Sequence, residues 1–453
     1  MLHTLPATRI AALCRSGGLR VPDLAEALCA RIAALDPVLN AFADFEADFV
    51  RAQAQHIQYR LEAGEALPLA GVPVSVKDNL WVGGRPASCG SHVFADFIAP
   101  RDSWSVARLR EAGALILGLT NCSEFACKGV TSSPLHGDTR NPWNTALTPG
   151  GSSGGALALA TDSGGSTRRP AAHTGLVGFK PTTGRIPHPW GFADPTQPLN
   201  AIGQIGRNVA DVRLMFTTLA GHHGGDPLAS PAPLIEEAPA LRIAWSPDLG
   251  LGHPLDAEVR ACLEGVIARL RDAGWQVADA APAWPAQLAD TNLMALQHAG
   301  LYELFGERHR HDPQCFDPAI AAQIEAGADI SGAAVVRLQL LRERIVATMA
   351  EFFETHDLLL CPTVPCEPWP LEQLGPAHIG GLPAGPRGHA VFTPLFNHAG
   401  TPALSLPCGL GTRGLPLGLQ LVGPRFADLR VLEAASRIEA LLGPLPACPL
   451  LTP

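Results

Sequence analysis

The stretch that decides the fold runs from Pro149 to Pro170 and has the sequence PGGSSGGALALATDSGGSTRRP. It holds two clusters rich in glycine and serine, at 149–155 and 161–170. Glycine lets a ligand approach the main chain closely, and a serine after two glycines can present its hydroxyl beside a row of N–H groups. Acyl transfer needs this pairing of nucleophile and oxyanion hole. One such cluster would fit an ordinary turn, whereas two indicate a site.

Lysine is rare in this chain. The 33 basic residues are 30 Arg and three Lys, namely Lys77, Lys128 and Lys180. Arginine keeps its proton in a protein, whereas a buried lysine can lose it, so chemistry that needs a neutral amine has three candidates. Lys77 stands in the motif GVPVSVKDN at 71–79, which favours a catalytic role. Lys180 is expected to be structural, and Lys128 matches no motif and is expected at the surface.

Composition narrows the class of protein. The 453 residues are 47% hydrophobic and 17% charged, which is typical of a globular chain that builds a core. The net charge of −9 argues against a broad nucleic-acid-binding face. We find neither a signal peptide nor an apolar run of about 18 residues. The eleven cysteines lack C-x2-C zinc spacing, so we expect buried thiols in a reducing cytoplasm, with no metal and no membrane.

Helical and strand patterns alternate along the chain. An apolar segment at 69–76 suits a buried strand, and a helix–Gly–strand pattern at 106–119 returns at 256–278. This alternation indicates an α/β fold with layers of helices on a sheet. We expect one domain over 1–453, made of an N-terminal helical segment at 1–64, a core at 71–207 and the remainder at 208–453.

These segments carry a family resemblance. Together with Thr120-Asn121, Asn141-Pro142-Trp143 and GLVGFKPT at 175–182, the motif around Lys77 and the two clusters resemble the amidase signature family of serine amidohydrolases over about 71–207. The resemblance implies that family's fold, a central mixed β-sheet covered by helices on both faces with an N-terminal helical segment. It also implies hydrolysis of carboxamides without a cofactor.

By motif position, the resemblance assigns a catalytic triad. Ser166 is the nucleophile, Ser152 the bridging serine in a cis peptide, and Lys77 the base. The oxyanion hole would consist of the backbone N–H groups of Ser163, Gly164, Gly165 and Ser166. A serine needs a base to become a good nucleophile, and a lysine can serve when burial lowers its pKa.

Substrate contacts are assigned to the residues beside the triad. Arg169 resembles the arginine of members that act on small amides bearing a carboxylate, and Ser153 is a second candidate contact. Arginine can hold a carboxylate through two parallel hydrogen bonds. The alternative, in which Arg168 and Arg169 both pair with acidic side chains of the fold, stays open.

One segment departs from the family pattern. Ser166 follows Ser152 by only 14 positions, and the link is about ten residues shorter than in the family, roughly 15 Å of helix rise. Three explanations are compatible with this: a rerouted link with an intact site, a deletion that disrupts the triad, or residues of the natural chain that this sequence lacks.

The sequence therefore predicts an amidohydrolase that cleaves a carboxamide C–N bond through a serine acyl-enzyme, on a small amide with a carboxylate as a candidate substituent. One alternative is the A subunit of a tRNA-dependent amidotransferase, which works with dedicated partners. Another is a scaffold disabled by the short link. The expected partner is the amide substrate itself. Two further possibilities are a second copy of the chain in a homodimer and a small helical subunit. We expect no direct contact with nucleic acid.

Overall fold

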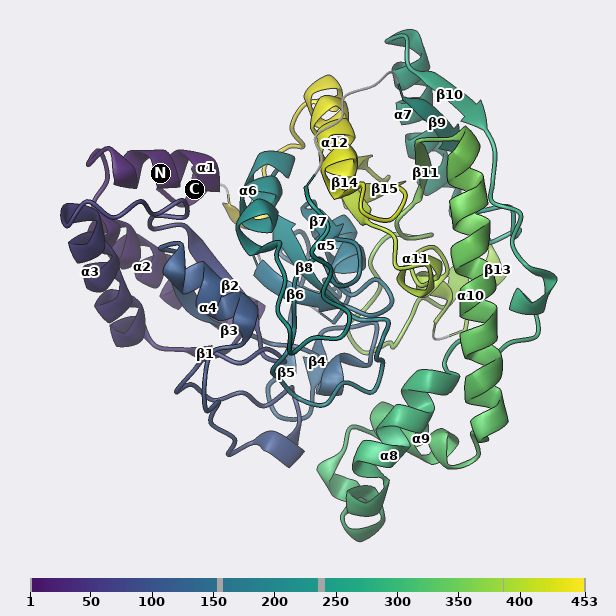
Figure 1. Cartoon of the computed structure of the whole chain (residues 1–453), viewed down its shortest axis with the longest axis horizontal. Coiled ribbons are helices and arrows are strands. Elements are labelled where there is room, and N and C mark those ends of the chain that lie inside the picture. Colours follow the sequence, from purple (N-terminus) through teal and green to yellow (C-terminus); the bar gives the residue numbers. More distant parts are fainter. Residues whose placement is uncertain (1, 153–157, 235–240, 386, 452–453) are drawn as a thin grey trace.

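The computed structural model describes residues 2–152, 158–234, 241–385 and 387–451. In the part described, a large sheet runs through the molecule with helices packed around it (Figure 1). The candidate substrate contact Ser153 and the first residues of the short link, at 153–157, lie outside these ranges.

The sheet has eleven strands and is mixed. β2 is parallel to both β3 and β6, and β9 is parallel to both β10 and β11, whereas the other pairs are antiparallel. This confirms the α/β class and the mixed sheet expected from the sequence. From one edge to the other, the order is β1 (Phe42–Phe45), β3 (Leu115–Thr120), β2 (Pro73–Lys77), β6 (Ala158–Asp162), β8 (Ala201–Gly206), β7 (Val177–Lys180), β14 (Ala403–Leu410), β15 (Pro416–Val422), β11 (Leu358–Pro362), β9 (Arg242–Trp245) and β10 (Gln276–Asp279).

Side chains that alternate along β6 show which helices cover each face of the sheet. Ala158 and Ala160 are buried with Ala171 of the short helix α5 (Arg168–Thr174). Leu159, between them, belongs to the main core instead. That core is completed by α4 (Trp104–Glu111), α6 (Val209–Leu219), α7 (Ala257–Asp272) and α12 (Asp428–Leu442). Because successive strand residues point to opposite faces, helices cover both faces, as the resemblance implied.

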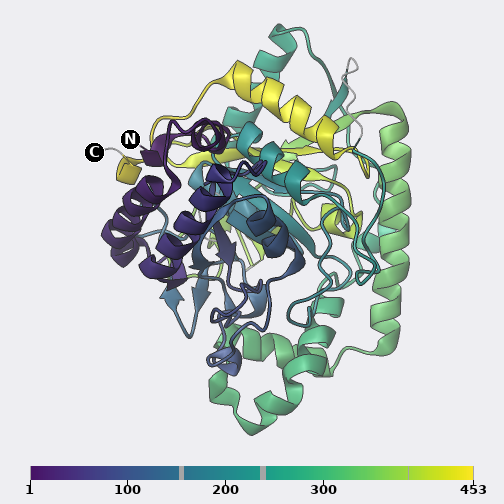
Figure 2. The same cartoon turned by 60° about the vertical axis from the view of Figure 1, so that its left-hand side comes forward.

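The N-terminal segment is helical with one addition. Apolar residues of its helices, such as Leu24, Leu28 and Ile57, form a second core cluster. The purple helices of this segment lie together on one side of the molecule (Figure 2). The sequence did not predict β1, which pairs antiparallel with the edge of β3. The helices are α1 (Ala7–Arg15), α2 (Val21–Leu39) and α3 (Ala47–Glu62).

A helical layer made of residues between 295 and 355 lies beside the sheet. The long α10 (Gly332–Thr355) runs along one side of the molecule, and α8 (Ala295–His311) and α9 (Pro318–Ala328) lie near one end of it (Figure 1). Among the described residues, no single helix is long and apolar enough to cross a membrane. On length and composition, the bent pair α9 and α10, at 101°, passes that test.

The sheet brings the motif around Lys77 and the cluster at 161–170 to the carboxyl ends of neighbouring strands. β2 ends at Lys77, and the parallel neighbour β6 ends at Asp162, directly before the second glycine cluster. The carboxyl ends of parallel strands meet at the same edge, where ligands of α/β proteins bind. A site assembled from Lys77 and the 161–170 segment therefore follows from the strand order.

Candidate active site

Lys77 is fully buried at the end of β2. Its Nζ donates to Ser152 Oγ at 2.7 Å and to Thr161 Oγ1 at 3.1 Å. Asn79 Nδ2 also donates to Thr161 Oγ1, at 2.9 Å. The structure therefore brings together two of the three residues assigned to the triad.

Burial lowers the pKa of Lys77 below the ordinary value of 10.5. No carboxylate hydrogen-bonds to Nζ in the described chain, and the charge of Asp162 only partly opposes the effect of burial on this pKa. A lysine in these surroundings can carry a neutral amine, which is the form that accepts a proton.

Ser152 follows a cis peptide bond to Gly151, as the resemblance implied. Its Oγ accepts from Lys77 and donates to the Ala126 carbonyl at 3.2 Å. Phe125 and Ala126 have positive φ values of 51° and 59°. A Cβ on Gly151 would lie 2.5 Å from the backbone of Val130, so glycine is required there.

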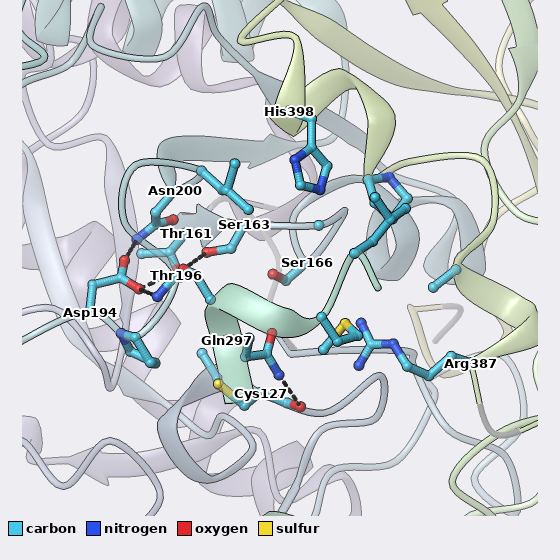
Figure 3. A pocket seen from close by; sticks show the side chains of 18 of the residues that line it. Cys127, Thr161, Ser163, Ser166, Asp194, Thr196, Asn200, Gln297, Arg387 and His398 are labelled. Carbon is cyan, nitrogen blue, oxygen red and sulfur yellow. Dashed lines mark hydrogen bonds between the residues drawn. The ribbon is translucent and has the colours of Figure 1, made fainter. Parts of the chain in front are cut away.

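Ser166 lies at the cavity and lines it (Figure 3). Its side chain is 6% exposed, whereas Lys77 and Ser152 are fully buried. In the described part of the chain, no hydrogen bond joins Ser166 Oγ to Ser152 Oγ. Catalytic hydrogen bonds are often long in unliganded enzymes and shorten when substrate binds.

The loop that carries Ser166 is held by Asp162. One carboxylate oxygen accepts from the Gly165 N–H at 2.7 Å and the other from the Thr167 N–H at 3.2 Å. Burial alone would raise the pKa of Asp162, but the charge and hydrogen bonds of Arg168 hold it well below its ordinary value. Asp162 is therefore an anion that shapes the loop.

Thr393 fixes the same loop from the opposite side. Its Oγ1 donates to the Gly164 carbonyl at 2.7 Å. Gly165 has φ of +111°, and a Cβ there would lie 2.2 Å from Thr393 Oγ1. Only glycine satisfies both the conformation and the close contact.

The adjacent arginines Arg168 and Arg169 differ sharply in their partners. Arg168 is fully buried and donates to Asp162, Asn397 Oδ1, Gln420 Oε1 and the Thr393 carbonyl. It therefore pairs with an acidic side chain of the fold, which is the alternative that stayed open for this arginine.

Arg169 is 4% exposed and lines the cavity. Its Nε and Nη1 have no hydrogen-bond partner among the described residues, and Nη2 reaches the Gly151 carbonyl at 3.5 Å. Burial and the charge of Arg387 lower its pKa to about 9, so it remains charged at neutral pH. A buried cation without an anion is costly, and a bound anion would supply the missing partner. Two interpretations were open for Arg169, a contact with a substrate carboxylate and a pair with an acidic side chain of the fold. In the described structure, no acidic side chain pairs with Arg169.

The cavity above Ser166 has a volume of about 610 Å³. Cavities of this order accept ligands of drug-like size. Its wall is mostly apolar, and polar groups gather near the glycine loop, where Thr196 Oγ1 lies 2.8 Å from Ser163 Oγ (Figure 3). The apolar wall includes Phe94, Phe125, Phe192, Phe305, Trp284 and Leu293.

The other two lysines are also buried. Lys180 Nζ donates to the Pro181 carbonyl, and burial and the charge of Arg168 lower its pKa to about 7. Lys128 was expected at the surface, and this was wrong: its side chain is buried, lines the cavity and pairs with Asp317 at 2.5 Å. The carboxylate at the start of α9, almost 190 positions away in sequence, accounts for the burial.

Several residues of the site were not predicted from the sequence. Thr393, Asn397 and Gln420 lie more than 200 positions after the glycine loop and touch it only in the fold. Thr161 and Asn79 could have been predicted, since Thr161 stands in the cluster at 161–170 and Asn79 in the motif at 71–79. In the described ranges, no group of three or more His, Cys, Asp or Glu side chains could hold a metal ion.

Comparisons with known proteins agree with this geometry. A family model described as Amidase matches residues 23–432. An acylamidase of Rhodococcus erythropolis is 35% identical, with 97% of this chain and 96% of that protein covered. The A subunit of the glutamyl-tRNA(Gln) amidotransferase of Symbiobacterium thermophilum is 33% identical, with 99% of each chain covered.

Solved structures give the same picture. A bacterial aryl acylamidase of the amidase signature enzymes superposes with a TM-score of 0.88 at 28% identity, covering 96% of each chain. A 6-aminohexanoate cyclic dimer hydrolase superposes with a TM-score of 0.86 at 26% identity, covering 99% of each chain.

Proposed function

The chain belongs to the amidase signature family, and from this premise we propose that Ser166 is its nucleophile, activated by Lys77 through Ser152. The chain is an amidohydrolase, an enzyme that cleaves carboxamide C–N bonds. The observation that supports the catalytic assignment is the 2.7 Å hydrogen bond between Lys77 Nζ and Ser152 Oγ, buried beneath a cavity that Ser166 lines. A single continuous sheet supports one catalytic domain over the whole chain.

In the proposed first step, Ser166 Oγ bonds to the amide carbonyl carbon. Its proton passes to Ser152 Oγ as the proton of Ser152 passes to neutral Lys77. The C–N bond then breaks, and the departing nitrogen takes a proton back along the same path. Water next attacks the ester on Ser166 by the same relay, which gives a carboxylic acid and regenerates the serine. The overall reaction adds one water to one amide.

The proposed oxyanion hole is smaller than the sequence suggested. The Gly165 N–H already donates to Asp162, which leaves the N–H groups of Ser163, Gly164 and Ser166 for the developing negative charge. Oriented backbone donors of this kind stabilise a tetrahedral intermediate without rearranging during the reaction.

The cavity supports a substrate with an apolar acyl or aryl group and a carboxylate. Aromatic side chains such as Phe125 and Phe305, stacked with ring centroids 4.0 Å apart, form an apolar wall. Arg169 supplies a cation without an anionic partner in the described structure, as a carboxylate-bearing amide requires. The names of the acylamidase and aryl acylamidase relatives agree with the apolar part of this substrate class.

The test is a panel of amides followed by release of ammonia or amine. It includes the matched pair N-phenylbutanamide and 4-anilino-4-oxobutanoate, which differ by a methyl group against a carboxylate. We expect hydrolysis of anilides by the wild type, a preference for the carboxylate, and no activity in Ser166→Ala. Activity that persists in Ser166→Ala would refute the nucleophile assignment.

A second candidate function is the glutaminase half of a tRNA-dependent amidotransferase. The A subunits of glutamyl-tRNA(Gln) amidotransferases resemble this chain over nearly its whole length. This candidate predicts a small helical partner, co-purification with an RNA-binding protein, and glutamine as the preferred amide. Preference for anilides over glutamine in the isolated chain would rule it out.

The third candidate, a catalytically impaired scaffold, is favoured by the short link between Ser152 and Ser166 and by the missing hydrogen bond between these two serines in the described structure. It predicts no labelling by a fluorophosphonate.

For the compartment, we propose the cytoplasm, and this is supported by eleven cysteines that are all free thiols.

A further inference from the structure

His398 ends the short helix α11 (Leu395–His398), which is tied to the nucleophile loop. Asn397 Nδ2 donates to the Asp162 carbonyl at 2.7 Å, and Thr393, just before the helix, donates to the Gly164 carbonyl. The His398 carbonyl accepts from Arg342 Nε at 3.1 Å. These hydrogen bonds therefore fix the backbone around His398 relative to the loop that carries Ser166.

The imidazole of His398 faces the cavity. It lines the cavity and lies on the same side as Ser166 in the close view (Figure 3). The side chain is 2% exposed, Nδ1 is buried without a partner, and neither ring nitrogen hydrogen-bonds to another described residue. Burial and the charge of Arg342 lower the pKa of His398 to about 4, so the ring is neutral near pH 7. A neutral imidazole offers one donor and one acceptor.

An unpartnered histidine alone is not evidence of a binding site. His173 in α5 is also buried, with both ring nitrogens unpartnered among the described residues, yet it packs edge-on against Trp369 and does not line the cavity. What distinguishes His398 is its place on the cavity wall, on a helix fixed to the loop of the nucleophile.

We propose that His398 is a specificity-determining residue that hydrogen-bonds an uncharged polar group of the amide substrate, such as a hydroxyl or a second carboxamide. This inference rests on the proposed amidase site and goes beyond the carboxylate contact of Arg169. A buried polar group left unpaired disfavours binding, so a substrate that pairs with His398 is preferred over one that does not.

The experiment compares two pairs of anilides that differ by one uncharged polar group. Acetanilide and 4-hydroxyacetanilide test the amine side of the scissile bond, and N-phenylbutanamide and N-phenylsuccinamide test the acyl side. We expect wild type to favour the polar member of at least one pair by about tenfold or more in kcat/KM, the order of one hydrogen bond to a buried group. His398→Leu should bring that ratio close to one, and His398→Gln should restore part of it.

His173→Leu is the matched control, because it removes an equally buried ring away from the cavity and should leave the ratio as in wild type. The inference is overturned if wild type prefers neither polar member or if His398→Leu keeps the wild-type ratio. It is also overturned if His398→Leu lowers kcat/KM equally for all four anilides. If His398→Leu does not fold, His398→Met replaces it and is judged by the same criteria.

A binding measurement separates this inference from the proposed mechanism. Calorimetric Kd values of both pairs on the Ser166→Ala protein need no turnover. A polar preference there that disappears with His398→Leu supports the role of His398 even if Ser166 is not the nucleophile. Equal Kd values within both pairs would contradict it.

Discussion

The floor and the wall of the cavity differ in the hydrogen bonding of their polar side chains. We call floor two buried hydrogen-bonded groups that meet at the neighbouring residues Thr161 and Asp162: Lys77 with Ser152 and Thr161, and Asp162 with Arg168 and Asn397. We call wall the lining that holds Arg169 and His398, where Nε and Nη1 of the arginine and Nδ1 of the histidine lack partners among the described residues.

Arg168 and Arg169 show what this difference teaches. They are adjacent in sequence and both buried, but one completes the floor, whereas the other lines the cavity with its charge unpaired among the described residues. An unpaired buried group is costly, so one that faces a cavity favours a ligand that supplies the partner. Changes in the floor should therefore abolish chemistry or stability, whereas changes in the wall should alter substrate choice.

The largest effect is expected in the floor at Lys77. Lys77→Met removes the proposed base and should lower kcat by about 10⁴-fold or more, as loss of a triad member does elsewhere. Lys180→Met is the matched control, since Lys180 is equally buried but bonds only a carbonyl. Steady-state kinetics on an anilide check this. Equal losses of kcat in the two variants would remove Lys77 from the chemistry.

The next effect concerns the stability of the floor. Arg168→Met leaves Asp162 buried without its cation and should lower the free energy of unfolding by about 3–5 kcal/mol, measured in urea. The pKa of Asp162 is depressed in the folded wild type, so the stability it contributes is present above about pH 4 and is lost as pH falls further. The difference between the two proteins should therefore shrink below about pH 4. A difference that does not change with pH would contradict the pairing.

The wall should respond differently at Arg169. Arg169→Gln should raise KM for 4-anilino-4-oxobutanoate by about 10–100-fold, the order of a lost charged hydrogen bond, and change KM for N-phenylbutanamide little. Unfolding in urea should show no loss comparable to that of Arg168→Met. Equal increases of KM for the two anilides would show that Arg169 does not recognise the carboxylate.

The last prediction changes no residue and concerns the pH dependence of the wild type. Since only the neutral amine of Lys77 accepts a proton, kcat/KM should rise about tenfold per pH unit on an acid limb and level off above the pKa of Lys77. Burial places that pKa below 10.5. His398, with a pKa of about 4, should not contribute above about pH 5.5. A kcat/KM for a neutral anilide that falls as pH rises from about pH 5 to about pH 8 would argue against lysine as the base.

The sequence predicted the floor far better than the wall. The motif around Lys77 and the clusters at 149–155 and 161–170 are local patterns, so motif position alone assigned Lys77, Ser152 and Ser166. The wall comes from segments around 190–200, 284–305 and 387–398, which meet only when the sheet is assembled. His398 and the buried position of Lys128 depend on those long-range contacts and left no local signal. The edge strand β1 was missed because its four residues lie within a helical segment.

The most direct test of the account is the mass of the peptide that carries Ser166 after reaction with a fluorophosphonate. We predict one phosphonate adduct per chain, located on Ser166 by fragmentation, absent from Ser166→Ala and formed much more slowly in Lys77→Met. An adduct on Ser152, or no adduct on a preparation that hydrolyses anilides, would contradict the assignment of Ser166 as nucleophile.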